Sequence, residues 1–135
     1  MRTLSVCAVM LSSLVLALPA QSAERKAEQG ATLIVHNVFF ALKDNAPAKV
    51  QELVNACSKY LSKHPGEVYF STGPRAKEFA RDVNVQDWDV ALHIVFQTKA
   101  DHDRYADAPR HVQFIQENQA NWKKVRVFDS LLAAK

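Results

Sequence analysis

The segment from Ala31 to Leu42 is rich in β-branched and aromatic residues, and it is apolar on both of its alternating faces. One face carries Ile34, Val38, Phe40 and Leu42, and the other carries Leu33, Val35, Phe39 and Ala41. A strand of this kind needs cover on both sides, because an uncovered face would leave large apolar side chains in water. The segment therefore predicts a strand in the middle of a layered fold, and it constrains the architecture more than any other feature.

The rest of the chain alternates between helical and strand-like patterns. Residues 47–63 place an apolar stripe on one helical face, made of Val50, Leu53, Val54, Cys57, Tyr60 and Leu61. Pro65 and Gly66 end this helix. Further strands are predicted at residues 67–72, 88–98 and 124–132, and a second helical region at residues 100–122, interrupted at Pro109.

This order of elements, strand, helix, strand, strand, helix, strand, is that of the ferredoxin-like plan. It predicts an α+β fold with an antiparallel four-stranded sheet and helices over one face. Because the first and third predicted strands are apolar on the other face as well, we expect a second copy of the chain to cover it. The sequence therefore predicts a homodimer in which two sheets form one dimeric α/β barrel.

The N-terminus has the pattern of a secretory signal peptide. Arg2 is followed by an uncharged, largely apolar run that ends in small residues at Ala23, and charges resume at Glu24. The strongly apolar part is shorter than the ~20 residues that a membrane-spanning helix needs. We therefore expect residues 1–23 to be cleaved, the protein to be exported to the periplasm or secreted, and no membrane attachment to remain. An uncut membrane anchor is the alternative.

The charge argues against a nucleic-acid-binding protein, and the cysteine content excludes a disulfide-stabilised fold. The chain has 17 basic and 14 acidic residues, and loss of Arg2 with the signal peptide leaves 16 against 14, a net charge of +2. This balance argues against a nucleic-acid-binding surface, which needs a strongly basic face. Cys57 is the only cysteine after residue 23, so an intramolecular disulfide is excluded and stability must come from packing.

Several short motifs occur in a characteristic order. His36 opens the sequence HNVFFALKD, Pro65-Gly66-x-Val68 leads into the second predicted strand, and Tyr105, Pro109-Arg110-His111 and Phe128-Asp129 follow. Together they resemble the stress-responsive A/B barrel (Dabb) domains, and the resemblance runs from Leu33 to Asp129, nearly all of the predicted domain at residues 31–132. The resemblance implies a homodimer with a cavity between the sheet and the helices.

Some Dabb proteins are polyketide cyclases of the olivetolic acid type. In these proteins the residues that resemble Tyr105 and His111 serve catalysis, and the histidine that resembles His36 lines the pocket. A histidine in an apolar pocket favours its neutral form, which can accept a proton, and a tyrosine hydroxyl can orient a carbonyl group. Tyr105 and His111 are therefore the candidate catalytic residues. The predicted ligand pocket comprises His36, Val38, Phe40, Val90, Leu92, Phe114 and Trp122.

Each candidate also has a purely structural alternative. Tyr105 can be a core tyrosine with its hydroxyl at the rim, and His36 and His111 can fill space and hydrogen-bond to neighbouring groups. Val90 stands where a further pocket histidine often opens the third strand in the family, so the chain departs from the cyclase pattern there. His93 is expected to pack under a helix or to form a local hydrogen bond.

The remaining histidines do not indicate a metal site. His64 and His102 are expected at the surface. His93, His102 and His111 recur every nine residues, but they fall on different predicted elements and match no metal-ligand motif. We therefore expect neither a metal ion nor another cofactor.

Three functions remain open at this point. The leading hypothesis is an exported homodimer, related to stress, whose apolar barrel pocket binds a small hydrophobic or aromatic ligand. The second is an enzyme of the cyclase or lyase kind that uses Tyr105 and His111 for acid–base chemistry on a carbonyl substrate. The third is a structural, stress-protective dimer without a ligand.

Overall fold

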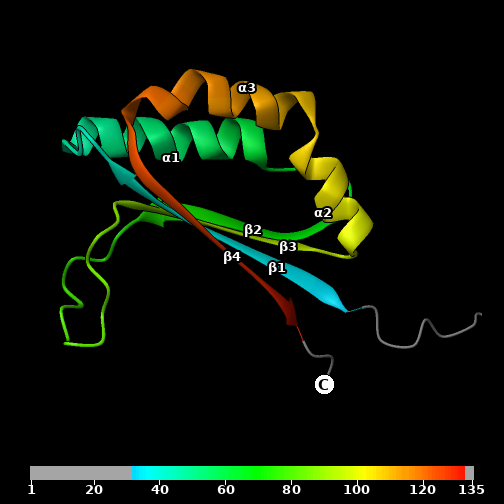
Figure 1. The fold of residues 1–135 in the computed structure, drawn as a ribbon, viewed down its shortest axis with the longest axis horizontal. Helices are drawn as coiled ribbons and strands as arrows, with labels where there is room; N and C mark the ends of the chain where they lie inside the picture. The colour runs from blue at the N-terminus through cyan, green and yellow to red at the C-terminus, as the bar shows by residue number, and fades with distance from the viewer. Residues whose placement is uncertain (1–31, 133–135) are drawn as a thin grey trace, which may run out of the picture.

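Residues 32–132 are described by the computed structural model, in which four strands form one sheet and the helices lie against one of its faces (Figure 1). In chain order the elements are β1 (Leu33–Leu42), α1 (Pro47–Leu61), β2 (Glu67–Pro74), β3 (Val90–Phe96), α2 (Lys99–Ala106), α3 (Pro109–Asn118), the 3₁₀ turn η1 (Gln119–Asn121) and β4 (Trp122–Leu132). The strands pair antiparallel in the order β2-β3-β1-β4. The predicted α+β, ferredoxin-like fold is confirmed.

The predicted signal peptide lies outside the described residues. Within residues 32–132, no helix combines the length and the apolar character that crossing a bilayer requires.

The hydrophobic core lies between the helices and one face of the sheet. It consists of Val38, Phe40, Leu42, Leu53, Cys57, Tyr60, Leu61, Val90, Leu92, Ile94, Phe96, Tyr105 and Phe114. Burying each large side chain of this set stabilises the fold by roughly 1.5–3 kcal/mol, so α1 and α3 are held by the sheet beneath them. The thiol of Cys57 belongs to this core, where burial raises its pKa to about 12 and keeps it protonated.

The opposite face of the sheet carries no helix in the described chain (Figure 1). Because side chains alternate along a strand, Phe39 on β1, His93 on β3 and Phe128 on β4 share this open face. The Phe39 ring lies 5.8 Å from that of His93 and 5.9 Å from that of Phe128. On the same face Tyr69 is 54% exposed and Phe128 is 53% exposed. This open face is the surface that the sequence predicts a second copy to cover.

Several strand boundaries differ from the prediction. The predicted second strand ends at Thr72, whereas β2 continues through Gly73 and Pro74, which pair with Ala91 and Val90 of β3. Pro74 is tolerated there because it ends an edge strand. Trp122 was predicted to end the second helical region, but it begins β4, because η1 closes the helix and Trp122 itself has an extended backbone.

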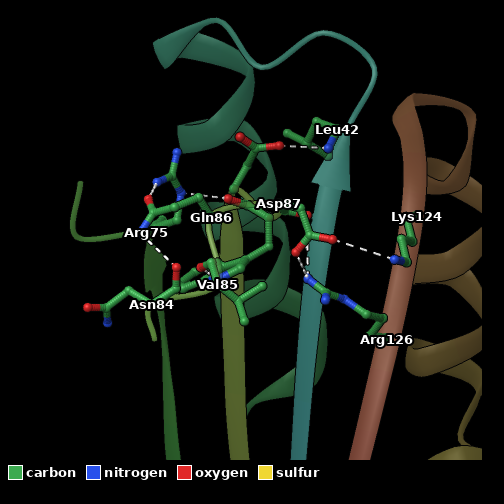
Figure 2. Close-up of polar contacts among 10 residues, drawn as sticks. Leu42, Arg75, Asn84, Val85, Gln86, Asp87, Lys124 and Arg126 are labelled. Carbon is green, nitrogen blue, oxygen red and sulfur yellow. Dashed lines mark hydrogen bonds and ion pairs between the residues drawn. The ribbon is translucent and has the colours of Figure 1, made fainter. Parts of the chain in front are cut away.

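The long connection between β2 and β3 is fixed by polar contacts at one end of the sheet (Figure 2). The Asp87 carboxylate accepts a 2.5 Å hydrogen bond from Arg126 and lies 3.5 Å from the Lys124 ammonium group, both on β4. The Asp89 carboxylate accepts a 2.8 Å hydrogen bond from the backbone N–H of Leu42. The predicted third strand begins at residue 88, whereas β3 begins at Val90. Asp87 and Asp89 precede β3 and bind residues of β4 and β1 through their side chains.

Candidate functional site

Tyr105 lies at the centre of a cluster of imidazole rings. Its own side chain, on α2, is only 2% exposed. The distances from its ring centroid to the neighbouring histidines are 4.7 Å for His111, 4.9 Å for His64, 5.8 Å for His36 and 6.5 Å for His102. These residues come from β1, the α1–β2 turn, α2 and α3, so the fold brings together groups that are distant in the sequence.

His36 is paired with Asp129 across the sheet. The two residues are direct partners in the β1–β4 register, and His36 Nδ1 lies 2.6 Å from an Asp129 carboxylate oxygen. The carboxylate accepts a hydrogen bond from Nδ1–H, which leaves Nε2 of His36 as an acceptor. Burial lowers the pKa of His36, and the hydrogen bond to Asp129 opposes this only in part. The His36 imidazole is therefore held neutral and oriented.

His111 is oriented by the backbone of α2. Pro109 begins α3, and two residues later Nδ1 of His111 donates a 2.8 Å hydrogen bond to the carbonyl of Ala106. A carbonyl can only accept, so Nδ1 carries the proton and Nε2 keeps its lone pair. Burial lowers the pKa of His111 and raises the pKa of Tyr105. At neutral pH the cluster therefore offers two imidazole acceptors and one protonated phenol.

One histidine was placed wrongly by the sequence analysis, and one alternative given for a second is met. His64 was expected at the surface, but it is buried, and its Nε2 donates a 2.9 Å hydrogen bond to the carbonyl of Tyr60 at the end of α1. His93 does form the local hydrogen bond that was one of its predicted roles, at 2.6 Å to Asn37. It lies on the open face, however, and not under a helix.

The apolar residues predicted to line a ligand pocket pack against one another in the core. Val38, Phe40, Val90, Leu92 and Phe114 are each 5% exposed or less. Trp122 packs on this set, 5.2 Å from the Phe40 ring and 5.7 Å from the Phe114 ring. Within the single subunit these side chains pack together in or against the core, and their role as a pocket wall stays a prediction.

The Tyr105 cluster reaches the surface beside a depression of about 360 Å³. This depression is lined by Ile34, Lys99, His102, Asp103, Asp129, Ser130 and Leu131. The sequence analysis did not select His102 or Asp129 as site residues. Two signals could have found them: His102 precedes Tyr105 by one helical turn, and Asp129 closes the Phe128-Asp129 motif.

Residues 34–131 match the profile of the stress-responsive A/B barrel domain. The chain belongs to the Dabb family. The match includes His36, His102, Tyr105, His111 and Asp129, so the cluster lies wholly within the family domain. No match to a curated protein sequence was found.

Solved structures share the fold of this Dabb protein at low sequence identity. A Dabb family protein from Mesorhizobium loti is 22% identical, with a TM-score of 0.63 over 76% of this chain and 99% of that chain. A dimeric ferredoxin-like protein of unknown function from Thermobifida fusca is 19% identical, with a TM-score of 0.64 over 77% of this chain and 93% of that chain. A hydroxynitrile lyase from Passiflora edulis is 14% identical, with a TM-score of 0.64 over 78% of this chain and 98% of that chain. At these identities the likeness concerns the fold.

Proposed function

We propose that this Dabb protein is a homodimer that binds a small, largely apolar or aromatic molecule through a hydroxyl or carbonyl group at the Tyr105 cluster. One observation carries the proposal: the Tyr105 ring lies 5.8 Å from the His36 ring and 4.7 Å from the His111 ring, and hydrogen bonds from both Nδ1 atoms leave both Nε2 atoms as acceptors. A ligand hydroxyl can donate to an imidazole Nε2, and a ligand carbonyl can accept from the Tyr105 hydroxyl. The apolar core around the cluster favours a ligand that is apolar elsewhere.

The dimeric part of the proposal is supported by the open face of the sheet and by the dimeric relative from Thermobifida fusca. Two open faces packed together would bury Phe39, Tyr69 and Phe128 of both subunits, as the apolar pattern of β1 requires.

Ligand binding can be tested with two aromatic probes, benzaldehyde as a carbonyl compound and mandelonitrile as a hydroxyl compound. Saturable binding is expected by isothermal titration. Tyr105→Phe should weaken binding of benzaldehyde, and His111→Gln should weaken binding of mandelonitrile, by about 5–12-fold each, since each change removes a hydrogen bond worth roughly 1–1.5 kcal/mol. His93→Gln on the open face is the matched control and should leave affinity unchanged. Binding of neither probe, together with high thermal stability, would favour the structural, stress-protective dimer.

Acid–base catalysis is a second candidate, supported by the His36–Asp129 pair and by the fold shared with a hydroxynitrile lyase. In cyanohydrin cleavage an imidazole accepts the hydroxyl proton, the bond between carbon and cyanide breaks, and cyanide takes up a proton and leaves as HCN. Mandelonitrile cleavage, followed by the appearance of benzaldehyde, tests this candidate directly. Loss of a general base should lower the rate by about 10²–10⁴-fold in His111→Gln. An unchanged rate in that variant would remove His111 from the reaction.

We further infer that the protein is exported, from the signal-peptide pattern of residues 1–23. N-terminal sequencing of the protein recovered outside the cytoplasm should begin at Ala23 or Glu24. A chain that retains Met1 in the membrane fraction would contradict export and favour the uncut anchor.

A further inference from the structure

Three side chains from separate elements gather where β1, α2 and β4 meet. His36, His102 and Asp129 each place one potential metal-binding atom within 4.8 Å of the other two. The β1–β4 register puts His36 opposite Asp129, and α2 brings the His102 ring to 5.0 Å from that of His36. Two imidazoles and one carboxylate make a donor set that suits divalent first-row transition metals.

The separations of these atoms are close to those of a metal site. His36 Nδ1 lies 2.6 Å from an Asp129 oxygen, and His102 Nε2 lies 4.0 Å from the same oxygen. In a tetrahedral zinc site with bonds of about 2.0–2.1 Å, neighbouring ligand atoms are about 3.4 Å apart. The two separations would have to change by about 0.8 Å and 0.6 Å to reach that value. The Asp129 side chain, which is 49% exposed, is free to make such a shift.

The imidazole of His102 also contacts a carboxylate at the nitrogen that is farther from Asp129. An Asp103 carboxylate oxygen lies 3.5 Å from His102 Nδ1, and Lys99 holds that carboxylate through a 2.6 Å ion pair. A carboxylate at one imidazole nitrogen places the proton there and leaves the lone pair of the other nitrogen for a metal. In this chain the other nitrogen, Nε2 of His102, is the one nearer Asp129.

The three side chains also leave room for a further ligand. His102 and Asp129 line the depression of about 360 Å³ beside the Tyr105 cluster. A site with three protein ligands and a solvent-facing position is typical of metals that bind an exchangeable water or substrate.

We propose that His36, His102 and Asp129 bind one divalent transition-metal ion per subunit, such as Zn²⁺, with an open coordination position toward this depression. The sequence spacing could not indicate this site, since the ligands belong to three elements spread from β1 to β4. The trio considered there, His93, His102 and His111, is divided by the sheet, because His93 lies on the open face. Metal binding through Nδ1 of His36 replaces the hydrogen bond from that nitrogen to Asp129. The metal-bound state and the proposed ligand-binding state are therefore alternatives at His36, and each is tested by itself.

The test uses the mature protein without an affinity tag, stripped with a chelator that is then removed. Zn²⁺ is titrated by calorimetry, and Co²⁺ by its visible absorption, which reports on coordination geometry. We expect one equivalent per subunit and an absorption typical of four or five ligands. His102→Leu and Asp129→Asn should each weaken binding at least about 100-fold, since changes in residues that only orient a ligand already cost 10–100-fold. Asp103→Asn should cost about 10-fold for the same reason.

His111→Gln and His93→Gln are the matched controls, because they remove other histidines and should leave metal affinity unchanged. Absence of saturable binding in folded wild-type protein would overturn the proposal. So would equal affinity in wild type and in both His102→Leu and Asp129→Asn, since the ion would then bind elsewhere. The two proposals separate cleanly: failure of the aromatic probes to bind leaves the metal titration intact, and failure of the metal titration leaves the probe assays intact.

Discussion

Substitution of Phe128 tests most directly whether a second subunit packs on the open face of the sheet. The residue is 53% exposed in the single subunit. A phenylalanine side chain presents about 200 Å² of apolar surface, so about 100 Å² per subunit is available for burial in a dimer. At about 25 cal/mol per Å² this corresponds to roughly 2.5 kcal/mol per subunit. In a twofold-symmetric dimer both copies of Phe128 lie in the interface, so the upper value for their contribution to the free energy of dimerisation is about 5 kcal/mol.

Phe128→Ser should therefore raise the dimer dissociation constant by at least about 100-fold, and by up to about 10³–10⁴-fold, because each 1.4 kcal/mol is a factor of ten. Sedimentation velocity over a range of protein concentrations measures this directly, and circular dichroism checks that the subunit stays folded. Val112→Ser is the matched control, since Val112 is 42% exposed but lies on α3, on the other side of the sheet. An unchanged dimer in Phe128→Ser, or dissociation in Val112→Ser, would refute the reasoning.

The remaining predictions concern the core, one turn and the open face. Phe96→Ala, at a fully buried position, should lower the free energy of unfolding by about 3–5 kcal/mol in urea denaturation, and a loss below 1 kcal/mol would contradict the packing. Gly66→Ala should cost about 1–3 kcal/mol by the same assay, because Gly66 has a φ of 81° and an added Cβ would collide with the Asp101 side chain; a neutral effect would mean that the turn adopts another conformation. Burial lowers the pKa of His93 below its usual value of about 6.5, so the folded state favours the neutral imidazole. Stability should accordingly be greatest above pH 6.5 and fall as the pH drops below it, and the fall should be smaller in His93→Gln; an equal fall in the two proteins would show that His93 does not contribute.

Much of the fold could be predicted because its strongest signals are local. The two apolar faces of residues 33–42 placed β1 at the centre, and the stripe from Val50 to Leu61 placed α1. The boundaries that were missed depend on tertiary contacts. Trp122 continues the apolar pattern of the preceding helix, and only η1 and the pairing with Leu42 place it in β4. Asp89 lies just before β3, and its carboxylate accepts a hydrogen bond from the backbone of Leu42. No local sequence pattern encodes this contact.

The candidate site was predictable in part. Family resemblance selected His36, Tyr105 and His111, and the structure brings these three together, while their chemical role stays a prediction. His102 and Asp129 were missed as partners because their proximity depends on the β1–β4 register and on where α2 begins. The apolar set around Val38 and Leu92 was expected to be buried, and it is. Its role as a pocket wall stays a prediction, since pattern alone cannot distinguish a buried side chain that lines a cavity from one that fills the core.

The orientation of the two imidazoles beside Tyr105 carries the central claim about the site. Long-range proton–nitrogen NMR of metal-free protein at neutral pH reports which nitrogen of each histidine bears the proton. We expect His36 and His111 to be neutral and to carry the proton on Nδ1, with Nε2 unprotonated. A proton on Nε2 of either residue, or a charged imidazole at neutral pH, would contradict the arrangement from which the function is proposed.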